Sequence, residues 1–420
     1  MSNIIIPKNA DIDGIVEQMR SDACFDVADG EAPYFNDAFP IKRTGTPPKV
    51  PKVFLSNNCV FDCQYCGMRK SKEKRCRYTE TPRELAEIAV KEAHNNGHGV
   101  FISSSVFRSA DYTEELIIEA LKIIRSELYY QGYVHAKIMP GADPLLIAQA
   151  GMLADRISVN IELANSEGYK TIAKEKNKSN ILSPMSFIAQ KIKESGRRRW
   201  GEKTFARSGQ TTQVMAGAMG ETDRTLLVLA EALYKKYALR RVYYSPFGVP
   251  SHSPECLPAN STPKWRVRRL YQADRLLQNY GFKADDLLPE QQSPLLEQSL
   301  DPKAVWALRH LSMYPVEINK ADYFSLVRVP GLGVNSANKI INERKQHKMT
   351  HEMLRKMGVW MNRAQFFITC DGKYEAAPPD GFERRVFSNT GSDWPEMLEF
   401  ALTEKLGDEG DGHLADDSPC

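Results

Sequence analysis

Short β-rich runs alternate with stretches of helical periodicity along this chain, and this alternation limits the possible folds more than any other feature. The β-rich runs are residues 53–56, 100–104, 133–139, 156–163, 211–217 and 241–247. The helical stretches between them are residues 82–95, 114–130, 144–154, 183–194 and 223–237. Such repetition predicts an α/β fold in which parallel strands have helices outside them. In an α/β barrel, the connections that follow the strands carry the chemistry.

The alternation occupies only part of the 420 residues, a length that allows two or three domains. A Pro- and Ser-rich stretch follows it, then a basic run, a compact helical segment and an acidic end. We therefore expect an N-terminal extension (1–50), the α/β unit (51–250), a linker with a basic helical segment (251–316), a small all-α domain (317–370) and a C-terminal extension with an acidic tail (371–420).

Composition excludes several classes of protein. The longest apolar runs, such as 226–233, are far shorter than the roughly 20 residues of a membrane span. The N-terminus lacks the basic and apolar regions of a secretory signal, so we expect a cytoplasmic protein. The 56 Lys and Arg nearly balance the 53 Asp and Glu, so bulk charge does not indicate a nucleic-acid partner. Eight cysteines without an export signal indicate reduced thiols and a metal rather than disulfides.

Cys59, Cys63 and Cys66 follow the first predicted strand with the spacing C-x3-C-x2-C, which lets three thiolates reach one metal centre. Structural zinc usually has four ligands. A [4Fe–4S] cluster held by three cysteines instead keeps one iron open for a substrate or cofactor. A zinc site completed by Cys76 or His94 is an alternative, as is chance clustering of buried thiols. We expect ordinary thiols at the other cysteines, which are Cys24, Cys76, Cys256, Cys370 and Cys420.

The cysteine motif, with Tyr65 just before its third cysteine, resembles the signature of radical S-adenosylmethionine (SAM) enzymes. The resemblance implies a partial (β/α)6 barrel and a [4Fe–4S] cluster on Cys59, Cys63 and Cys66 whose open iron binds SAM. It also implies that reduction of the cluster cleaves SAM to methionine and a 5′-deoxyadenosyl radical, which abstracts hydrogen from a substrate. Tyr65 would lie close to the adenine. No catalytic residue is assigned on this basis.

Polar side chains alternate with apolar ones over residues 156–163, whereas a strand buried on both faces is continuously apolar. Ser158, Asn160 and Glu162 share one face, which favours a polar interior, with a solvated outer face as the alternative. By the resemblance, Asn160 and Glu162 hydrogen-bond the ribose or the amino end of SAM.

Two further strands carry candidate contacts. After the second strand, Ser104 stands at the centre of a Ser-Ser-Ser run, where the superfamily usually has Gly-Gly-Glu. The backbone of Ser104 can still contact the amino group of SAM, because such a contact needs only free amides and carbonyls. On the third strand, His135 and Lys137 point to the same side and are candidates for contact with substrate or with the SAM carboxylate. One solvated face explains them equally well.

The run 213–221 resembles the late glycine-containing strand that packs on the adenine of SAM. This resemblance assigns Gln213 and Gly217 to cofactor binding, since glycine allows close backbone approach. Close packing within the protein explains a glycine at this position about as well.

A helical hairpin is predicted near the C-terminus, with a short amphipathic helix over 319–328, a turn over 329–334 and a second helix over 336–345. Glycines at alternate positions allow a tight turn that exposes amides at a helix N-terminus, which favours anion binding. The pattern resembles a helix-hairpin-helix DNA-binding motif, with protein docking or internal packing as the alternative. The resemblance implies that four residues contact the DNA backbone, namely Pro330, Gly331, Gly333 and Lys339.

Other features give weaker support for nucleic-acid binding. Residues 354–367, with Gly358 near their centre, resemble a degenerate second hairpin. The basic runs 197–200 and 264–269 each combine cations with an indole, which suits phosphates and stacked bases. A solvated charged surface is the alternative for both runs.

The pairing of a radical SAM barrel with this hairpin, over residues 51 to 370, resembles a bacterial family of DNA modification or repair radical SAM proteins. The resemblance implies DNA as a partner, a uracil-DNA-glycosylase-like partner protein, and an electron donor such as flavodoxin or ferredoxin. Two other functions stay open. One is a radical SAM enzyme acting on RNA or a small molecule, with the hairpin as a docking unit. The other is a non-catalytic iron–sulfur or zinc DNA-binding protein.

Overall fold

The computed structural model describes residues 50–72, 77–96, 99–196, 204–250, 255–298 and 300–375. The chain divides into two compact units, with the boundary between Val267 and Arg268. Several predicted features lie outside the described residues, namely the N-terminal extension except residue 50, the acidic tail, the basic run 197–200, Cys24, Cys76 and Cys420.

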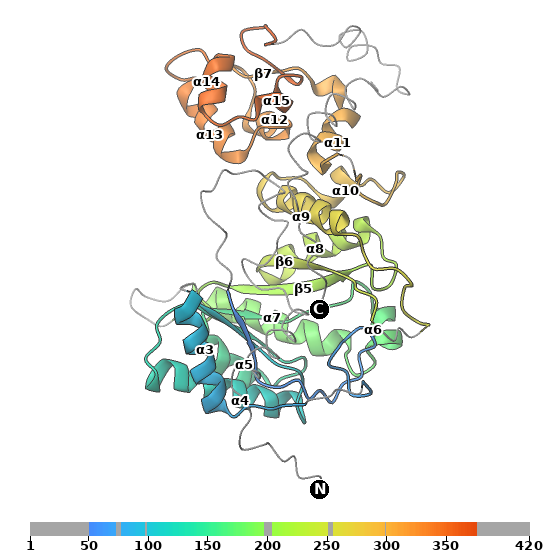
Figure 1. Cartoon of the computed structure of the whole chain (residues 1–420). Coiled ribbons are helices and arrows are strands. Elements are labelled where there is room, and N and C mark those ends of the chain that lie inside the picture. The colour runs from blue at the N-terminus through green and yellow to red at the C-terminus, as the bar shows by residue number, and fades with distance from the viewer. Residues whose placement is uncertain are drawn as a thin grey trace. The chain divides into compact units, whose positions relative to one another are not determined.

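The first unit contains one sheet of six parallel strands, which are neighbours in the order in which they occur in the sequence (Figure 1). This confirms the predicted α/β fold and is consistent with a partial (β/α) barrel. The strands are β1 (Lys52–Phe54), β2 (Val100–Ser103), β3 (Val134–Lys137), β4 (Arg156–Ser158), β5 (Gln210–Ala216) and β6 (Leu239–Pro246).

Helices connect these strands, as parallel pairing requires. Several begin at a polar N-cap whose side chain accepts an amide N–H: Ser109, Asp143 and Asn165 do so for the second, third and fourth helices. The helices are α3 (Pro82–Asn96), α4 (Ala110–Lys122) with the π-helix η1 (Ile123–Glu127), α5 (Pro144–Leu153), α6 (Ser166–Ile172), α7 (Lys178–Ser195) and α8 (Asp223–Tyr237).

The segment after β4 differs from its predicted course. The sequence pattern predicts one strand over 156–163, but β4 ends at Ser158. Glu162 has φ of 58°, a left-handed value that a regular strand does not accommodate. The segment nevertheless follows β5, because Glu162 N–H donates to Gln213 O at 2.8 Å and Met215 N–H donates to Glu162 O at 2.8 Å. Backbone hydrogen bonds therefore hold the segment that carries the predicted polar side chains against β5.

The polar residues within β5 are all buried, and two of them make hydrogen bonds to neighbouring segments. The Gln210 amide donates to Met185 O at 3.1 Å, and Thr212 Oγ1 donates to Val159 O at 2.7 Å. Hydrogen-bonded in this way, polar side chains can occupy a core without a large desolvation cost. They also tie β5 to α7 and to the segment after β4.

The second unit is helical except for one ladder of two parallel strands, β7 (Val316–Glu317) and β8 (Ile368–Thr369). Four of its helices, counting one 3-10 helix, fall within residues 251–316, for which the sequence predicted a linker with a basic helical segment. Among the described helices of both units, none has the length and apolar composition that crossing a membrane requires. The helices are α9 (Lys264–Asn279), which contains the boundary, α10 (Ala284–Leu287), α11 (Pro302–Arg309), the 3-10 helix η2 (Leu311–Met313), α12 (Tyr323–Arg328), α13 (Val334–Glu343), α14 (His351–Lys356) and α15 (Met361–Ala364).

Candidate functional site

The three cysteines of the motif lie on the loop that follows β1, at the carboxyl end of the sheet. Backbone hydrogen bonds tie this loop to two neighbouring connections. Val60 N–H donates to Val106 O, after β2, at 2.9 Å, and Gln64 N–H donates to Ile172 O, at the end of α6, at 2.8 Å. The loop is therefore fixed at the position where α/β barrels carry their chemistry.

The Arg77 guanidinium, which follows this loop in the sequence, hydrogen-bonds to the backbone of the loop. One side chain with several N–H donors can satisfy the carbonyls of an irregular loop, which would otherwise lack partners. Arg77 donates, at 2.8–3.4 Å, to the carbonyl oxygens of Asn57, Met68, Arg69, Lys70 and Lys72. The sequence did not single out Arg77, because it lies beyond the cysteine motif and shows no spacing relation to it.

The environment of the thiols suits metal binding as thiolates. Cys59 Sγ accepts the Phe61 N–H and Cys66 Sγ accepts the Met68 N–H, each at 3.4 Å. Amide bonds to sulfur stabilise negative charge on it and are among the features that tune iron–sulfur clusters. Burial raises the pKa of Cys66 to about 12 and also raises that of Cys63. Binding of a metal would therefore displace protons from these thiols.

Three thiols on one loop are the donor set of a three-cysteine cluster. Within the described residues, no three Cys, His, Asp or Glu side chains are grouped so that they could hold a single metal ion. The thiolates of a cluster bind different irons and need not meet at one point. Of the two alternative zinc ligands, His94 lies on α3 and packs edge-on against Tyr130, with ring centroids 5.5 Å apart. Cys76 lies outside the described residues.

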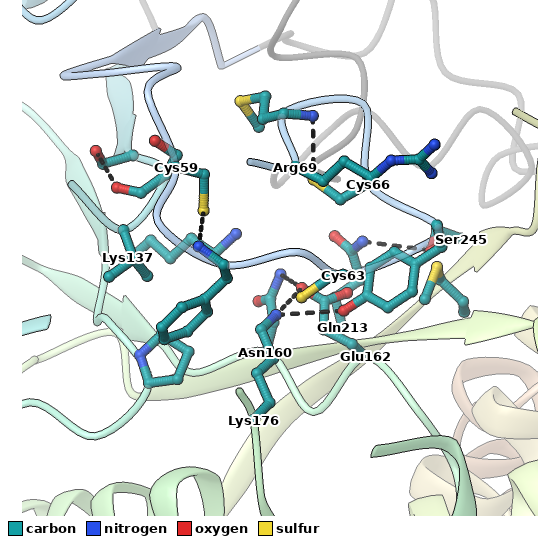
Figure 2. Close-up of a pocket in the computed structure, with 18 of the residues that line it drawn as sticks. Cys59, Cys63, Cys66, Arg69, Lys137, Asn160, Glu162, Lys176, Gln213 and Ser245 are labelled. Carbon is teal, nitrogen blue, oxygen red and sulfur yellow. Dashed lines mark hydrogen bonds and ion pairs between the residues drawn. The ribbon is translucent and has the colours of Figure 1, made fainter. Parts of the chain in front are cut away.

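A cavity of about 550 Å³ opens beside the cysteine loop and is lined from the carboxyl ends of several strands (Figure 2). Its wall combines the three thiols with apolar, amide and charged side chains. Besides the cysteines, the residues that line it include Phe61, Tyr65, Met68, Arg69, Ser104, Ser105, Lys137, Met139, Asn160, Glu162, Lys176, Gln213, Met215, Ser245 and Phe247.

Asn160, Glu162 and Lys176 form a network in this cavity, which Figure 2 shows. Asn160 Nδ2 donates to Glu162 Oε1 at 3.2 Å, and Lys176 Nζ lies 3.9 Å from the same oxygen. Lys176 Nζ also donates to the Tyr65 hydroxyl at 3.3 Å. The negative charges of Cys63 and Glu162 outweigh burial and raise the pKa of Lys176. The network places a carboxylate, an amide and an ammonium group where a zwitterionic ligand could be held.

Most residues predicted to bind the cofactor meet in this cavity. Tyr65, Ser104, Asn160 and Glu162 line it, and so does Gln213, whose amide donates to Ser245 Oγ at 3.3 Å. Their contact with SAM stays a prediction.

Gly217 is not among the residues that line the cavity. Its φ is +94°, and an added Cβ would lie 2.1 Å from Thr262 Oγ1. Close packing, the alternative given for this glycine, therefore accounts for it, and a role next to the adenine stays a prediction. On β3, Lys137 lines the cavity, whereas the buried His135 stacks on Phe101 with ring centroids 4.2 Å apart.

In the second unit, α12 and α13 form a helical hairpin around residues 329–333. Gly331 needs to be glycine, because its φ is +84° and an added Cβ would lie 2.4 Å from Trp360 O. Gly333, the N-cap of α13, has φ of −95°, a backbone conformation that does not require glycine. Pro330 is buried and Lys339 is exposed.

Two side chains brace this turn from within the second unit. The buried Lys303 donates from Nζ to Leu332 O at 2.6 Å, and the Tyr280 hydroxyl accepts the Val334 N–H. Burial lowers the pKa of Lys303 to about 7. A second turn, at Gly358 between α14 and α15, has φ of +83°, close to that of Gly331. Trp360 N–H, just after it, donates to Gly331 O at 2.9 Å, so the two turns pack together.

Cations of the basic run 264–269 have partners within the protein. Arg266 pairs with Asp223 at 2.6 Å, and Arg269 donates to Gln298 O at 2.7 Å. A structural use therefore accounts for these two, in place of phosphate binding. Lys264 and Arg268 of the same run are exposed.

Comparison with known proteins identifies the class to which the first unit belongs. Residues 53–233 match the family model described as the Radical SAM superfamily. These residues form a radical SAM domain, and the match does not specify a substrate. Members of this family bind a [4Fe–4S] cluster and SAM.

Among solved structures, the FeFe-hydrogenase maturase HydG from Carboxydothermus hydrogenoformans is similar, with 16% identity and a TM-score of 0.43. The similarity covers 63% of this chain and 63% of that one. A second structure, of HydG as a maturase of the [FeFe]-hydrogenase, gives 14% identity and a TM-score of 0.41, and covers 63% and 61% of the two chains. The chain thus spans less than two thirds of these HydG chains. A search of curated proteins finds no match.

Proposed function

We propose that the protein is a radical SAM enzyme that acts on DNA, as a modification or repair enzyme. When bound, the cluster and SAM supply a 5′-deoxyadenosyl radical that abstracts hydrogen. The chain's own residues then bind the cofactors, exclude water and present the target nucleotide. The observation that carries the DNA assignment is the hairpin of the second unit.

Within the first unit, Cys59, Cys63 and Cys66 would hold the cluster. Around the same cavity, Asn160 and Glu162 offer hydrogen bonds to the ribose or amino end of SAM, and Lys176 offers a cation to its carboxylate. Contacts to the rest of SAM are proposed for Tyr65, Ser104, Gln213 and Gly217. The apolar side chains in the wall would limit access of water to a radical.

The hairpin supports binding to a DNA backbone rather than to bases. The first turn of α13 leaves amides without intrahelical acceptors, and Gly333 adds no side-chain cap. Helix N-termini of this kind suit phosphate. The exposed Lys339 lies in the second turn of the same helix. Residues 317–375 carry ten Lys and Arg against six Asp and Glu, whereas the whole chain is nearly balanced.

A helix-hairpin-helix reading of this unit is supported by the glycine turn and by the second turn at Gly358. The Tyr280 hydroxyl already takes one amide of α13, that of Val334, which leaves those of Asn335 and Ser336 for a phosphate. Phosphate contacts position a protein on DNA without reading its sequence.

Two other functions are weighed against DNA. A radical SAM enzyme acting on RNA or on a small molecule would use the hairpin to dock a protein, and the match to the radical SAM domain fits that function equally. A non-catalytic metal or DNA-binding protein does not agree with that match. A uracil-DNA-glycosylase-like partner and an electron donor such as flavodoxin or ferredoxin belong to the proposal as well, as does a cytoplasmic location.

The proposal is tested by fluorescence anisotropy of labelled duplex DNA, single-stranded DNA and RNA across a salt series. We expect affinity for DNA that is nearly independent of sequence and falls steeply with salt, because phosphate contacts release counterions. Lys339→Ala should reduce the salt slope by about one unit if this side chain neutralises one phosphate. Lys235→Ala, on α8 of the first unit, is the matched control and should leave the slope unchanged. Equal slopes for wild type and Lys339→Ala would favour protein docking.

A further inference from the structure

Lys176 is a buried cation at the centre of the candidate site that the sequence motifs do not reveal. It lies in the short connection between α6 and α7, where its N–H donates to Ala173 O at 2.9 Å. Only 12% of its side chain is exposed. Its ammonium group therefore points into the cavity rather than into solvent, as Figure 2 shows.

The charges around Lys176 explain why a cation is stable there. Its Nζ donates at 3.3 Å to the hydroxyl of Tyr65, which lies between Cys63 and Cys66 in the sequence. Its nearest carboxylate oxygen is Glu162 Oε1, at 3.9 Å. Lys176 therefore shares the cavity wall with the three thiols and lies next to an acid.

We propose that the fixed positive charge of Lys176 raises the reduction potential of the cluster that Cys59, Cys63 and Cys66 hold. Reduction adds one electron, and therefore one negative charge, to the group on these thiolates, with no bond or proton transferred. A cation nearby stabilises the added charge, and the effect is large where water is excluded. Net charge and hydrogen bonding near the sulfurs are known to set such potentials.

This role differs from structural support and from holding SAM. If Lys176 only filled space or fixed the loop, its replacement by Met, which has a similar length, would leave the reduction potential of the cluster unchanged. A side chain that only holds a SAM carboxylate would not affect the cluster before SAM is added. Lys176→Arg provides the matched control, because it replaces the side chain and keeps the positive charge.

The test is an anaerobic redox titration of the reconstituted full-length protein without SAM, with dithionite as the one-electron donor and the reduced cluster followed by electron paramagnetic resonance. Lys176→Met should lower the equilibrium constant for reduction at least about tenfold, which corresponds to about 59 mV. Lys176→Arg should stay close to wild type. Glu162→Gln, which removes a negative charge beside Lys176, should shift the potential upward.

The proposal rests on the three cysteines being the cluster ligands, and the same preparation separates the two claims. Wild-type protein that takes up no iron would overturn the ligand assignment. Wild type and Lys176→Met with equal iron content and equal potentials would overturn the role of Lys176. A fall of the same size in Lys176→Arg would also overturn it, since the charge is kept. If Lys176→Met takes up no cluster, Glu162→Gln decides, because an unchanged or lower potential there contradicts the electrostatic account.

Discussion

Among single residues, the motif cysteines differ from the other described cysteines in their surroundings. Cys59, Cys63 and Cys66 line one cavity, whereas Cys256 is exposed. Cys370 is buried in the second unit, where burial raises its pKa to about 12. Position in the fold, and not only spacing in the sequence, therefore separates three metal-binding candidates from ordinary thiols.

Replacing Cys59, Cys63 or Cys66 by Ala should abolish SAM cleavage, because a cluster held by two thiolates is labile. Cys256→Ala should keep both iron and activity. Iron content and 5′-deoxyadenosine formation are measured under anaerobic conditions. Wild-type protein with stoichiometric zinc and no iron would contradict the assignment.

Glu162→Ala should weaken SAM binding while the visible absorption spectrum of the cluster is kept. Loss of one hydrogen bond to a charged group costs about 1.5–3 kcal/mol, or roughly tenfold to a hundredfold in dissociation constant. Ser158→Ala is the matched control, since Ser158 lies in the same segment but is not among the residues that line the cavity. Equal SAM affinity for wild type and Glu162→Ala, measured by equilibrium binding, would refute the contact.

Glu114 on α4 is fully buried and accepts the Met139 N–H at 2.9 Å, and Met139 lines the cavity. Burial raises the pKa of Glu114 to about 8, so the folded protein holds this proton more tightly than the unfolded chain does. Stability is therefore fully present below the ordinary carboxyl pKa and is lost as pH rises through about 8.

Glu114→Gln should remove this loss, because an amide does not ionise. The variant should gain up to a few kcal/mol over wild type near pH 9 and little near pH 5. Thermal unfolding of the reduced apo-protein across this pH range measures the difference. A constant difference between the two proteins at all pH values would contradict the raised pKa.

Residues with a characteristic spacing were predictable, and residues supplied by irregular segments were not. The resemblance to radical SAM enzymes implied that Asn160, Glu162 and the thiols share a site, and the structure brings them together in one cavity. Lys176 and Arg77 act from connections without periodicity, where only the three-dimensional fold decides what a side chain reaches. The backbone angle of Gly333 could not be read from its residue type either.

At the scale of elements, hydrophobic periodicity predicted the six strands and most helices, because burial of one face determines both. Helix α6 was missed because it is only seven residues long, which is too short for a clear helical periodicity. The N-cap of the next helix, Asn177, follows it closely. The early end of β4 was missed because the alternating pattern continues to Glu162, whereas the regular strand pairing stops at Ser158. The predicted helix over 114–130 begins earlier, at Ala110, and closes in a π-helix.

Substitutions at the two glycines of the hairpin turn separate the effect of backbone strain from the effect of adding a side chain. Gly331→Ala should destabilise the second unit by about 1 kcal/mol or more, because its positive φ disfavours a Cβ and the new atom would meet Trp360 O. Gly333→Ala should cost less, since its φ is negative and the nearest atom, Tyr280 Oη, would be 3.6 Å away. Denaturant unfolding of both variants gives the comparison, and equal losses would show that the turn geometry is misassigned.

At the scale of the whole molecule, the account joins a radical SAM domain to a unit proposed to bind a DNA backbone. Binding without base contacts would bring many sequences to the enzyme, so selectivity must come from the cavity. A base within a duplex cannot enter a cavity lined by thiols and strand ends, so the target nucleotide should be single-stranded or flipped out of the stack. The sequence predicted this pairing of units, but neither composition nor spacing indicates which atom is attacked.

The most direct measurement of this account is transfer of deuterium from DNA. Oligonucleotides deuterated at non-exchangeable sugar and base positions are incubated with reduced holoenzyme and SAM, and the products are analysed by mass spectrometry. The account predicts deuterium in 5′-deoxyadenosine or in recovered SAM with wild type, and none with Cys63→Ala. Cleavage of SAM without any deuterium from DNA, or equal transfer from RNA, would contradict the claim that DNA is the substrate.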